Sequence, residues 1–400
     1  MAENASAVNI PANGFQLSSL WLDQKYRSIT LQVIAAVLLL SFIGMIVNNT
    51  VKNLEILGID PGYDFLGDPS SYDISQHLIE YNSTSPHWKA GVVGLLNTLL
   101  VSLFGIVTAT IIGFLVGVFR LSKNWLVSRI SYVYIEITRN VPLLLQILLW
   151  YGITVHSLPK PKQALEPASN FFLSNRGLFM PKPVFESAMW LVVAAFIVAV
   201  VAAIWYAKRA HKLQDETGKI SPVLTVGASL ILGLPLLAFF VSGMPVSFDI
   251  PELKGFNYKG GMAIKPEFMA LWFALSMYTG AFIAEIVRAG IVSISHGQTE
   301  ASYSLGIKPS WTMRLVVLPQ ALRVIIPPLI SQYLNITKNS SLAIAVGYMD
   351  VVATIGGITL NQTGRALECM SIVLTTYLLI SLGISAVMNW YNKRVALVER

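Results

Sequence analysis

Eight apolar segments, each close to the length of a membrane-spanning helix, constrain this 400-residue chain more than any other feature. About 20 apolar residues are needed to cross the hydrocarbon core of a bilayer. Charged residues make up only 12% of the chain, far fewer than in an average soluble protein. The sequence therefore predicts an all-α polytopic membrane protein. The predicted spans are residues 29–50, 91–119, 131–155, 185–206, 222–242, 267–288, 321–337 and 368–391.

The distribution of basic residues predicts the orientation of these spans. An even number of spans places both termini on one side, and residues 1–28 resemble a retained cytoplasmic tail more than a cleaved signal peptide. With both termini in the cytoplasm, most Lys and Arg residues fall in inner segments, as expected for membrane proteins. The net charge of +7 is therefore interpreted as basic cytoplasmic loops, and no nucleic-acid partner is expected.

Two outer loops and the reactive side chains carry less information. Residues 51–90 are rich in Asp, Gly, Pro, Ser and Tyr, which fits a docking element, a lid or an irregular loop. Residues 156–184, which contain five prolines, are expected to form a second outer loop. Cys369 is the only cysteine, and the five histidines show no metal-binding spacing, so no metal site is expected.

The polar stretch GQTEASYSLGIKPSWTMRLVVLPQ at 297–320 interrupts the apolar pattern between two spans. Residues 298–304 are long enough for two helical turns, and Gly306 suits the left-handed position that ends a helix. Pro309 suits the first turn of a second helix. Pro319 is expected to separate that helix from the next span. We call 297–320 the elbow, and we expect it to be a rigid helix–turn–helix on the cytoplasmic face that another protein grips.

The elbow resembles the EAA signature of bacterial ABC-importer permeases, which reads EAA-x3-G-x9-I-x-LP. Ser302 and Val316 depart from that pattern. In that family the loop forms the coupling helix that docks on the ATP-hydrolysing subunit. The resemblance implies a coupling role for the matching residues Glu300, Ala301, Gly306, Leu318 and Pro319.

The flanking segments resemble polar amino acid permeases of the histidine/glutamine type, on the matches at 94–117, 134–152 and 280–298. Five of the eight spans would form an ABC-importer permease core. The enlarged plan resembles the general L-amino acid permease subunits of Gram-negative bacteria. The implied divisions are 1–89 (tail, first span and first periplasmic loop), 90–152 (core), 153–266 (insertion with two extra spans) and 267–400 (core, with the elbow).

This resemblance implies a non-catalytic subunit that carries amino acids from the periplasm to the cytoplasm across the bacterial inner membrane. No segment matches the phosphate-binding loop GxxxxGK[ST], and ETGKIS at 216–221 lacks its first glycine and its final hydroxyl residue. The chain is expected to bind no cofactor, with ATP and Mg bound by a partner. The implied partners are an ATP-binding subunit dimer, a periplasmic amino-acid-binding protein and a second permease, for which the resemblance favours a related chain over a copy.

Polar residues within the spans are the candidates for contact with a zwitterionic amino acid. Gln332, Asn335 and Asn339 share one helical face. Lys338 and Ser341 adjoin them, in a stretch that lies beside the pathway in the family. The alternative is ordinary helix-end polarity, with Lys338 reaching water.

Two further pairs of charged residues leave alternatives open. Arg139 and Asn140 would form a gate or an anion contact, whereas the local alternative is an ion pair between Arg139 and Glu136. Glu285 is a weaker substrate candidate, because Arg288 stands three residues later and favours a structural ion pair.

Two other functional classes remain compatible with the sequence. A stand-alone secondary transporter or channel for a small polar solute would not need the elbow, and it would often show internal repeats. A membrane enzyme would need convergent catalytic groups, but acidic residues and histidines are scattered here. The sequence leaves open which amino acids are carried, and whether this subunit or its partner holds the substrate.

Overall fold

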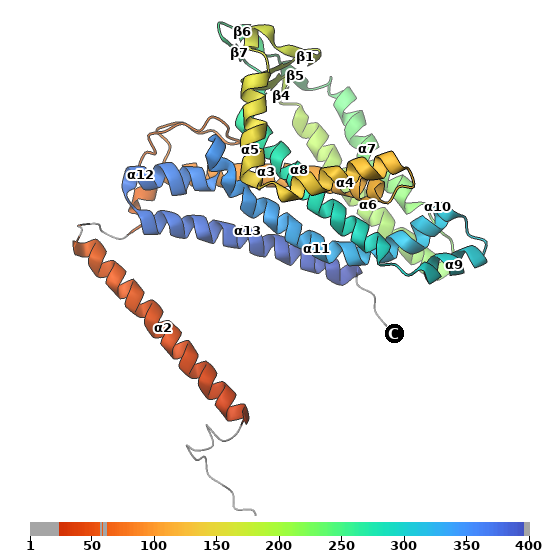
Figure 1. Ribbon diagram of the computed structural model, residues 1–400. Helices are drawn as coiled ribbons and strands as arrows, with labels where there is room; N and C mark the ends of the chain where they lie inside the picture. The colour runs from red at the N-terminus through yellow and green to blue at the C-terminus, as the bar shows by residue number, and fades with distance from the viewer. Residues whose placement is uncertain (1–23, 57, 59–61, 396–400) are drawn as a thin grey trace, which may run out of the picture.

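Helices α3 (His87–Arg120) and α8 (Pro266–Val292) pack against each other at the centre of a helical bundle (Figure 1). The structure is a computed structural model that describes residues 24–56, 58 and 62–395. Most of the predicted N-terminal tail therefore lies outside the described residues.

The remaining helices and strands complete the chain in the following order. The other helices are α2 (Gln24–Ile56), α4 (Trp125–Asn140), α5 (Leu143–Gly152), α6 (Met189–Thr217), α7 (Val223–Val241), α9 (His296–Ser304), α10 (Pro309–Thr312), α11 (Leu318–Asn339), α12 (Leu360–Thr363) and α13 (Ala366–Val395). The strands are β1 (Leu165–Ala168), β2 (Phe171–Ser174), β3 (Gly177–Met180), β4 (Lys182–Phe185), β5 (Val246–Asp249), β6 (Glu252–Lys254), β7 (Asn257–Lys259) and β8 (Met262–Ile264).

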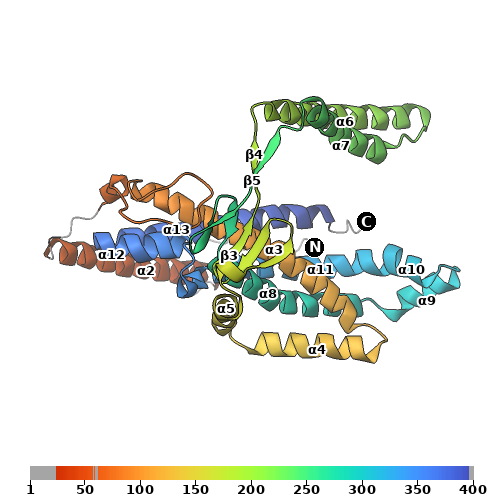
Figure 2. The same ribbon diagram turned by 90° about the horizontal axis from the view of Figure 1, so that it is seen from above.

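Seven of the eight predicted spans correspond to helical segments that are long and apolar enough to cross a membrane. The all-α polytopic class is thereby confirmed. The exception is the predicted span 131–155, which is two shorter helices, α4 and α5. Figures 1 and 2 both show α5 running crosswise to α4.

Pro142 explains why the third span bends. The residue before it, Val141, adopts an extended backbone (φ −96°, ψ 127°), as expected before proline. The broken helix leaves carbonyl groups without helical partners, and Gln146 supplies a substitute. Its side-chain amide donates to the carbonyls of Thr138 and Val141 at 2.8 and 2.9 Å. The carbonyl groups freed by the bend therefore keep hydrogen-bond partners within the protein, as a membrane environment requires.

Glycines allow the close contact of α3 with α8. A Cβ atom added at Gly117 would lie 2.7 Å from the carbonyl oxygen of Ala284, and one at Gly113 would lie 2.4 Å from Ile283. Small residues at such crossings let backbones approach closely, which maximises van der Waals contact inside a membrane. Further along α8, Gly290 packs equally closely against Ile325 of α11.

The predicted second outer loop, residues 156–184, contains strands, which were not predicted from the sequence, and two of them pair with the segment before α8. One sheet has the order β1-β2-β3-β8, and separate hairpins pair β4 with β5 and β6 with β7. The two-residue connection Asn175–Arg176 joins β2 to β3, with Ser174 opposite Gly177. Such short connections are typical of β-hairpins. Figure 2 shows β4 and β5 leading to the antiparallel pair α6 and α7, which stands beside the bundle.

The segment predicted as the first outer loop is ordered over residues 62–86. Phe65 is buried against Val351 and Ile355, within a short 3₁₀ turn at Asp64–Gly67. The hydroxyl group of Tyr72 lies 3.1 Å from that of Thr359, which also contacts His87. The loop is therefore a fixed cap over one end of the bundle, away from the elbow (Figure 1).

Candidate functional site

The elbow has the predicted helix–turn–helix form. Helix α9 ends in a Schellman motif, in which the Gly306 N–H donates to Tyr303 and the Ile307 N–H donates to the carbonyl of Ser302. Gly306 has a φ of +74°, so the predicted left-handed position is confirmed. Pro309 occupies the first turn of α10, also as predicted.

A buried hydroxyl pair fastens the two arms of the elbow together. Ser302 and Thr312 are 3% and 2% exposed, and their hydroxyl oxygens lie 2.8 Å apart. Ser302 occupies the position where the EAA signature has an alanine, so this departure from the signature adds a contact. The elbow is therefore a fixed shape, held by side-chain as well as backbone bonds.

The elbow lies outside the predicted spans, yet several of its exposed side chains are apolar. Tyr303, Leu305 and Trp311 are 48%, 79% and 52% exposed. The candidate coupling residues are exposed as well: Glu300, Ala301, Gly306, Leu318 and Pro319. An exposed patch of this kind usually marks a protein interface.

The prediction that Pro319 separates the elbow from the next span is wrong. Helix α10 continues through a π-helical turn at Met313–Val317 directly into α11. The Leu318 N–H donates to the carbonyl of Met313, five residues earlier. This wider turn accommodates the ring of Pro319, which would clash in a regular helix. The second arm of the elbow and α11 therefore form one continuous rod.

Helix α11 carries the polar face that the sequence predicts, although Pro327 and Pro328 lie within it. Asn335 and Lys338 are exposed, and Gln332 and Asn339 are half-buried, whereas the neighbouring Ile336 and Thr337 are fully buried. The hydroxyl group of Ser341 donates to the Lys338 carbonyl at 2.7 Å. Within the part of the chain that the structure describes, the side chains of Gln332, Asn335, Lys338 and Asn339 have no hydrogen-bond or ion-pair partner.

The alternative prediction, an ion pair between Glu136 and Arg139, is wrong, because the described residues do not form that ion pair. The Arg139 guanidinium instead lies 5.1 Å from the ring centroid of Phe282 on α8. The Asn140 amide donates to the Glu136 carbonyl at 2.7 Å, which holds the last turn of α4. Arg139 is therefore directed to α8, which the spacing along α4 alone did not indicate.

Glu285 forms the structural ion pair with Arg288 that the sequence offered as an alternative. Two guanidinium nitrogens of Arg288 contact the carboxylate, at 2.6 and 3.0–3.1 Å. Glu285 and Arg139 thus lie at the contact of α4 with α8, whereas the other substrate candidates lie on α11. The structure brings the candidates together as two groups and not as one site.

Sequence reasoning missed Asp350, a fully buried carboxyl group in the segment between α11 and α12. Its oxygens accept from the Ala353 N–H at 2.8 Å and from the Tyr377 hydroxyl at 3.0 Å. Beside it, the hydroxyl group of Thr98 on α3 accepts from the Val351 N–H at 3.3 Å. An acidic residue inside the apolar stretch GYMDVVATIGG was the signal that could have found it.

The Asp350 carboxyl makes stability depend on pH. Burial raises its pKa from 3.8 to about 6, so the folded chain holds this proton more tightly than the unfolded chain does. The free energy of unfolding should therefore fall by roughly 3 kcal/mol as the pH rises from about 3, below the unfolded pKa, to about 7, above the folded pKa. Asp350→Asn should remove this contribution, giving a flatter profile of unfolding temperature against pH in that window.

The control for this experiment is Glu80→Gln, which removes an exposed carboxylate from the first outer loop. Its profile should run parallel to that of the unmodified protein. An Asp350→Asn profile that is also parallel would show that the buried carboxyl does not titrate in this window.

Comparison with known proteins places these features in a family. Residues 217–397 match the model of the binding-protein-dependent transport system inner membrane component. The chain is 48% identical over 398 residues to the general L-amino acid transport system permease protein AapQ of Rhizobium johnstonii, covering 100% of this chain and 99% of that protein.

A second relative spans the chain equally well. The glutamate/glutamine/aspartate/asparagine transport system permease protein BztB of Rhodobacter capsulatus is 46% identical over 427 residues, covering 99% of this chain and all of that protein. Both matches extend over the cap, the α6–α7 pair and the elbow. This chain is therefore a multi-pass inner-membrane protein and belongs to the family of binding-protein-dependent transport inner membrane components, the permease subunits of ABC importers.

Proposed function

We propose that this chain carries amino acids across the inner membrane into the cytoplasm, driven by ATP hydrolysis in separate partner subunits. Two relatives that match its full length are named as permeases for general L-amino acids and for glutamate, glutamine, aspartate and asparagine. Family membership favours this importer function over the stand-alone transporter or channel considered from the sequence.

The observation that carries the proposal is the rigid, apolar surface of the elbow. A separate ATPase can move the spans only if the contact between them is stiff, because a flexible loop would absorb the displacement. The Schellman motif and the Ser302–Thr312 bond supply that stiffness. The exposed Tyr303, Leu305 and Trp311 supply area for a protein interface. We therefore assign coupling to the elbow, with Glu300 and Gly306 as its key residues.

The remaining partners follow from the same importer function. An ATP-binding subunit dimer would hold ATP and Mg, while this chain holds no cofactor. A periplasmic amino-acid-binding protein would deliver the solute to the end of the bundle that carries the cap. A second permease, more naturally a related chain than a copy, would complete the pathway. This arrangement puts the elbow, and with it both chain termini, in the cytoplasm.

The polar face of α11 is the proposed substrate path in this subunit. Gln332, Asn335, Lys338 and Asn339 offer both donors and acceptors, and no other described side chain satisfies them. Such a face is costly against lipid and favourable against a second permease or a hydrated path. Lys338 suits the carboxylate of an amino acid, and Asn335 suits its ammonium group.

The coupling role is tested by replacing Glu300 and Gly306 together, as Glu300→Ala with Gly306→Val. A β-branched residue in the left-handed position costs about 1–2 kcal/mol and should unfold the turn between the arms. Amino acid uptake should fall at least about tenfold, and the ATPase subunit should no longer co-purify.

The matched control lies in the connection between α6 and α7. Glu216→Ala with Gly218→Val makes the same substitutions, and Gly218 also has a left-handed backbone with φ +70°. This control should keep both uptake and ATPase binding. Intact uptake and ATPase binding in the elbow variant would overturn the coupling role.

The substrate role of Lys338 predicts that Lys338→Met strongly reduces uptake while assembly with the ATPase persists. Loss of a charge-assisted bond to the substrate should reduce uptake by roughly 10–100-fold. Lys259→Met, which removes an exposed cation from β7, is the control and should keep uptake unchanged. Normal uptake by the Lys338→Met protein would remove Lys338 from the path without affecting the elbow.

A further inference from the structure

A pocket of about 350 Å³ lies where α3 ends and α4 begins, at the end of the bundle that carries the elbow. It contains three cationic side chains and no carboxylate. The lining residues are Arg120, Ser122, Lys123, Trp125, Ser128, Arg129 and Tyr132.

Two of the cations lie against the same aromatic ring. The guanidinium groups of Arg120 and Arg129 lie 4.7 and 5.3 Å from the ring centroid of Tyr132. Ser128 fixes Arg120 further, because its hydroxyl group accepts from a guanidinium nitrogen at 3.3 Å. Like charges gathered in this way repel one another unless an anion joins them.

No anion within the described chain fills that role. Arg120 acts electrostatically on the carboxylate of Glu285, but Arg288 already binds both oxygens of that carboxylate. The start of α4 adds positive potential from its helix dipole. Asn124 caps that start by accepting from the N–H groups of Leu126 and Val127. The pocket therefore has the charge and the donors for a phosphate group.

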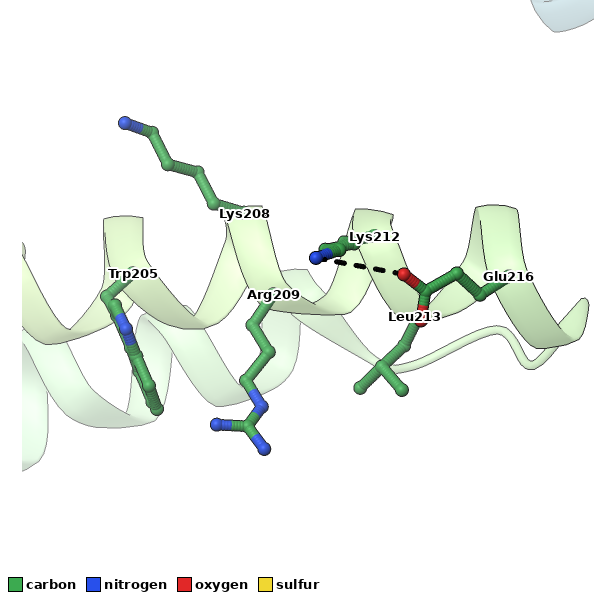
Figure 3. A pocket seen from close by; sticks show the side chains of 6 residues that line it. All are labelled: Trp205, Lys208, Arg209, Lys212, Leu213 and Glu216. Carbon is green, nitrogen blue, oxygen red and sulfur yellow. Dashed lines mark ion pairs between the residues drawn. The ribbon is translucent and has the colours of Figure 1, made fainter.

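The basic cluster on α6 lacks these properties. Figure 3 shows Lys208 and Arg209 pointing to opposite sides of the helix. Lys212 pairs with Glu216 at 3.8 Å, which neutralises it in part. That cluster is an exposed basic surface, and it offers no converging set of donors.

A row of exposed apolar side chains leads away from the pocket along α4. Leu126, Ile130, Val133 and Ile137 follow the 4-3-4 spacing of one helical face, and all four are exposed. Trp125, which is 75% exposed, lies between this apolar row and the basic pocket that it lines. Exposed indole rings of this kind favour the boundary between water and acyl chains. The site thus combines a phosphate-binding pocket with a surface for hydrocarbon.

We propose that this pocket binds the phosphate headgroup of an anionic phospholipid from the cytoplasmic leaflet. Arg120, Lys123 and Arg129 hold the phosphate, and the acyl chains lie along the exposed face of α4. The bound lipid neutralises the cation cluster and ties the α3–α4 connection to the membrane surface.

The test titrates the purified full-length chain, in the complex in which it is isolated, with dioctanoyl phosphatidylglycerol. Binding is followed by the rise in unfolding temperature and by native mass spectrometry. The site variant combines Arg120→Gln, Lys123→Gln and Arg129→Gln. It should bind about a hundredfold more weakly, because each basic residue contributes roughly a factor of five at an anionic lipid surface.

The charge-matched control combines Lys208→Gln, Arg209→Gln and Lys212→Gln on α6. It should bind the lipid as the unmodified complex does. An equal loss of binding in the control would overturn the proposal, since general surface charge would then explain the affinity. If the triple variant fails to fold, Arg129→Gln alone should still weaken binding about fivefold, because Arg129 is exposed and only its ring contact is lost.

Further measurements test whether the pocket binds another ligand instead of a lipid. Inorganic phosphate and glycerol 1-phosphate should bind far more weakly than the lipid, and equal binding would overturn a lipid ligand. If the site variant loses the ATPase subunit while its lipid binding is unchanged, the pocket contacts that subunit and the proposal fails.

Discussion

The close contact between α3 and α8 is the interaction on which the rest of the fold depends. Gly113 and Gly117 leave no room for side chains against Ile283 and Ala284, so the two backbones lie close together. A bilayer offers no hydrophobic force to drive helices together, and packing of this kind must replace it. The buried clusters around α5 and α11 build outward from this pair.

This contact also determines what the elbow can move. Helix α9 follows α8 after three residues, and the second arm runs without interruption into α11. Gly290 and Ile325 press α8 and α11 together just beyond the elbow. A displacement of the elbow is therefore passed to two packed helices at once, one of which carries the proposed substrate path around Lys338.

The parts of this fold that depend on local chemistry were predictable from sequence. Gly306 and Pro309 have backbone requirements that specify a turn, and the long apolar segments have few alternatives to spanning helices. The errors came from tertiary compensation. Gln146 allows the third span to bend at Pro142, and a π-helical turn lets the chain pass Pro319 without a break. Neither compensation has a local pattern of its own.

The candidate site was predictable to a similar degree. The spacing of Gln332, Asn335 and Asn339 indicated one polar face, and that face exists. The target of Arg139 was missed because Phe282 lies on another helix, far away in sequence. Asp350 was missed because Tyr377, its partner on α13, meets it only in the folded chain.

The central claim is that the elbow is the contact surface for a separate ATPase. It is tested most directly by site-specific cross-linking from Leu305→Cys, at the exposed turn of the elbow, in membranes that take up amino acids. The native Cys369 is buried and should not react. The account predicts a covalent adduct with the ATP-binding subunit, and none from Leu224→Cys at the exposed start of α7. Active membranes without a Leu305→Cys adduct, or with equal adducts from both positions, would contradict it.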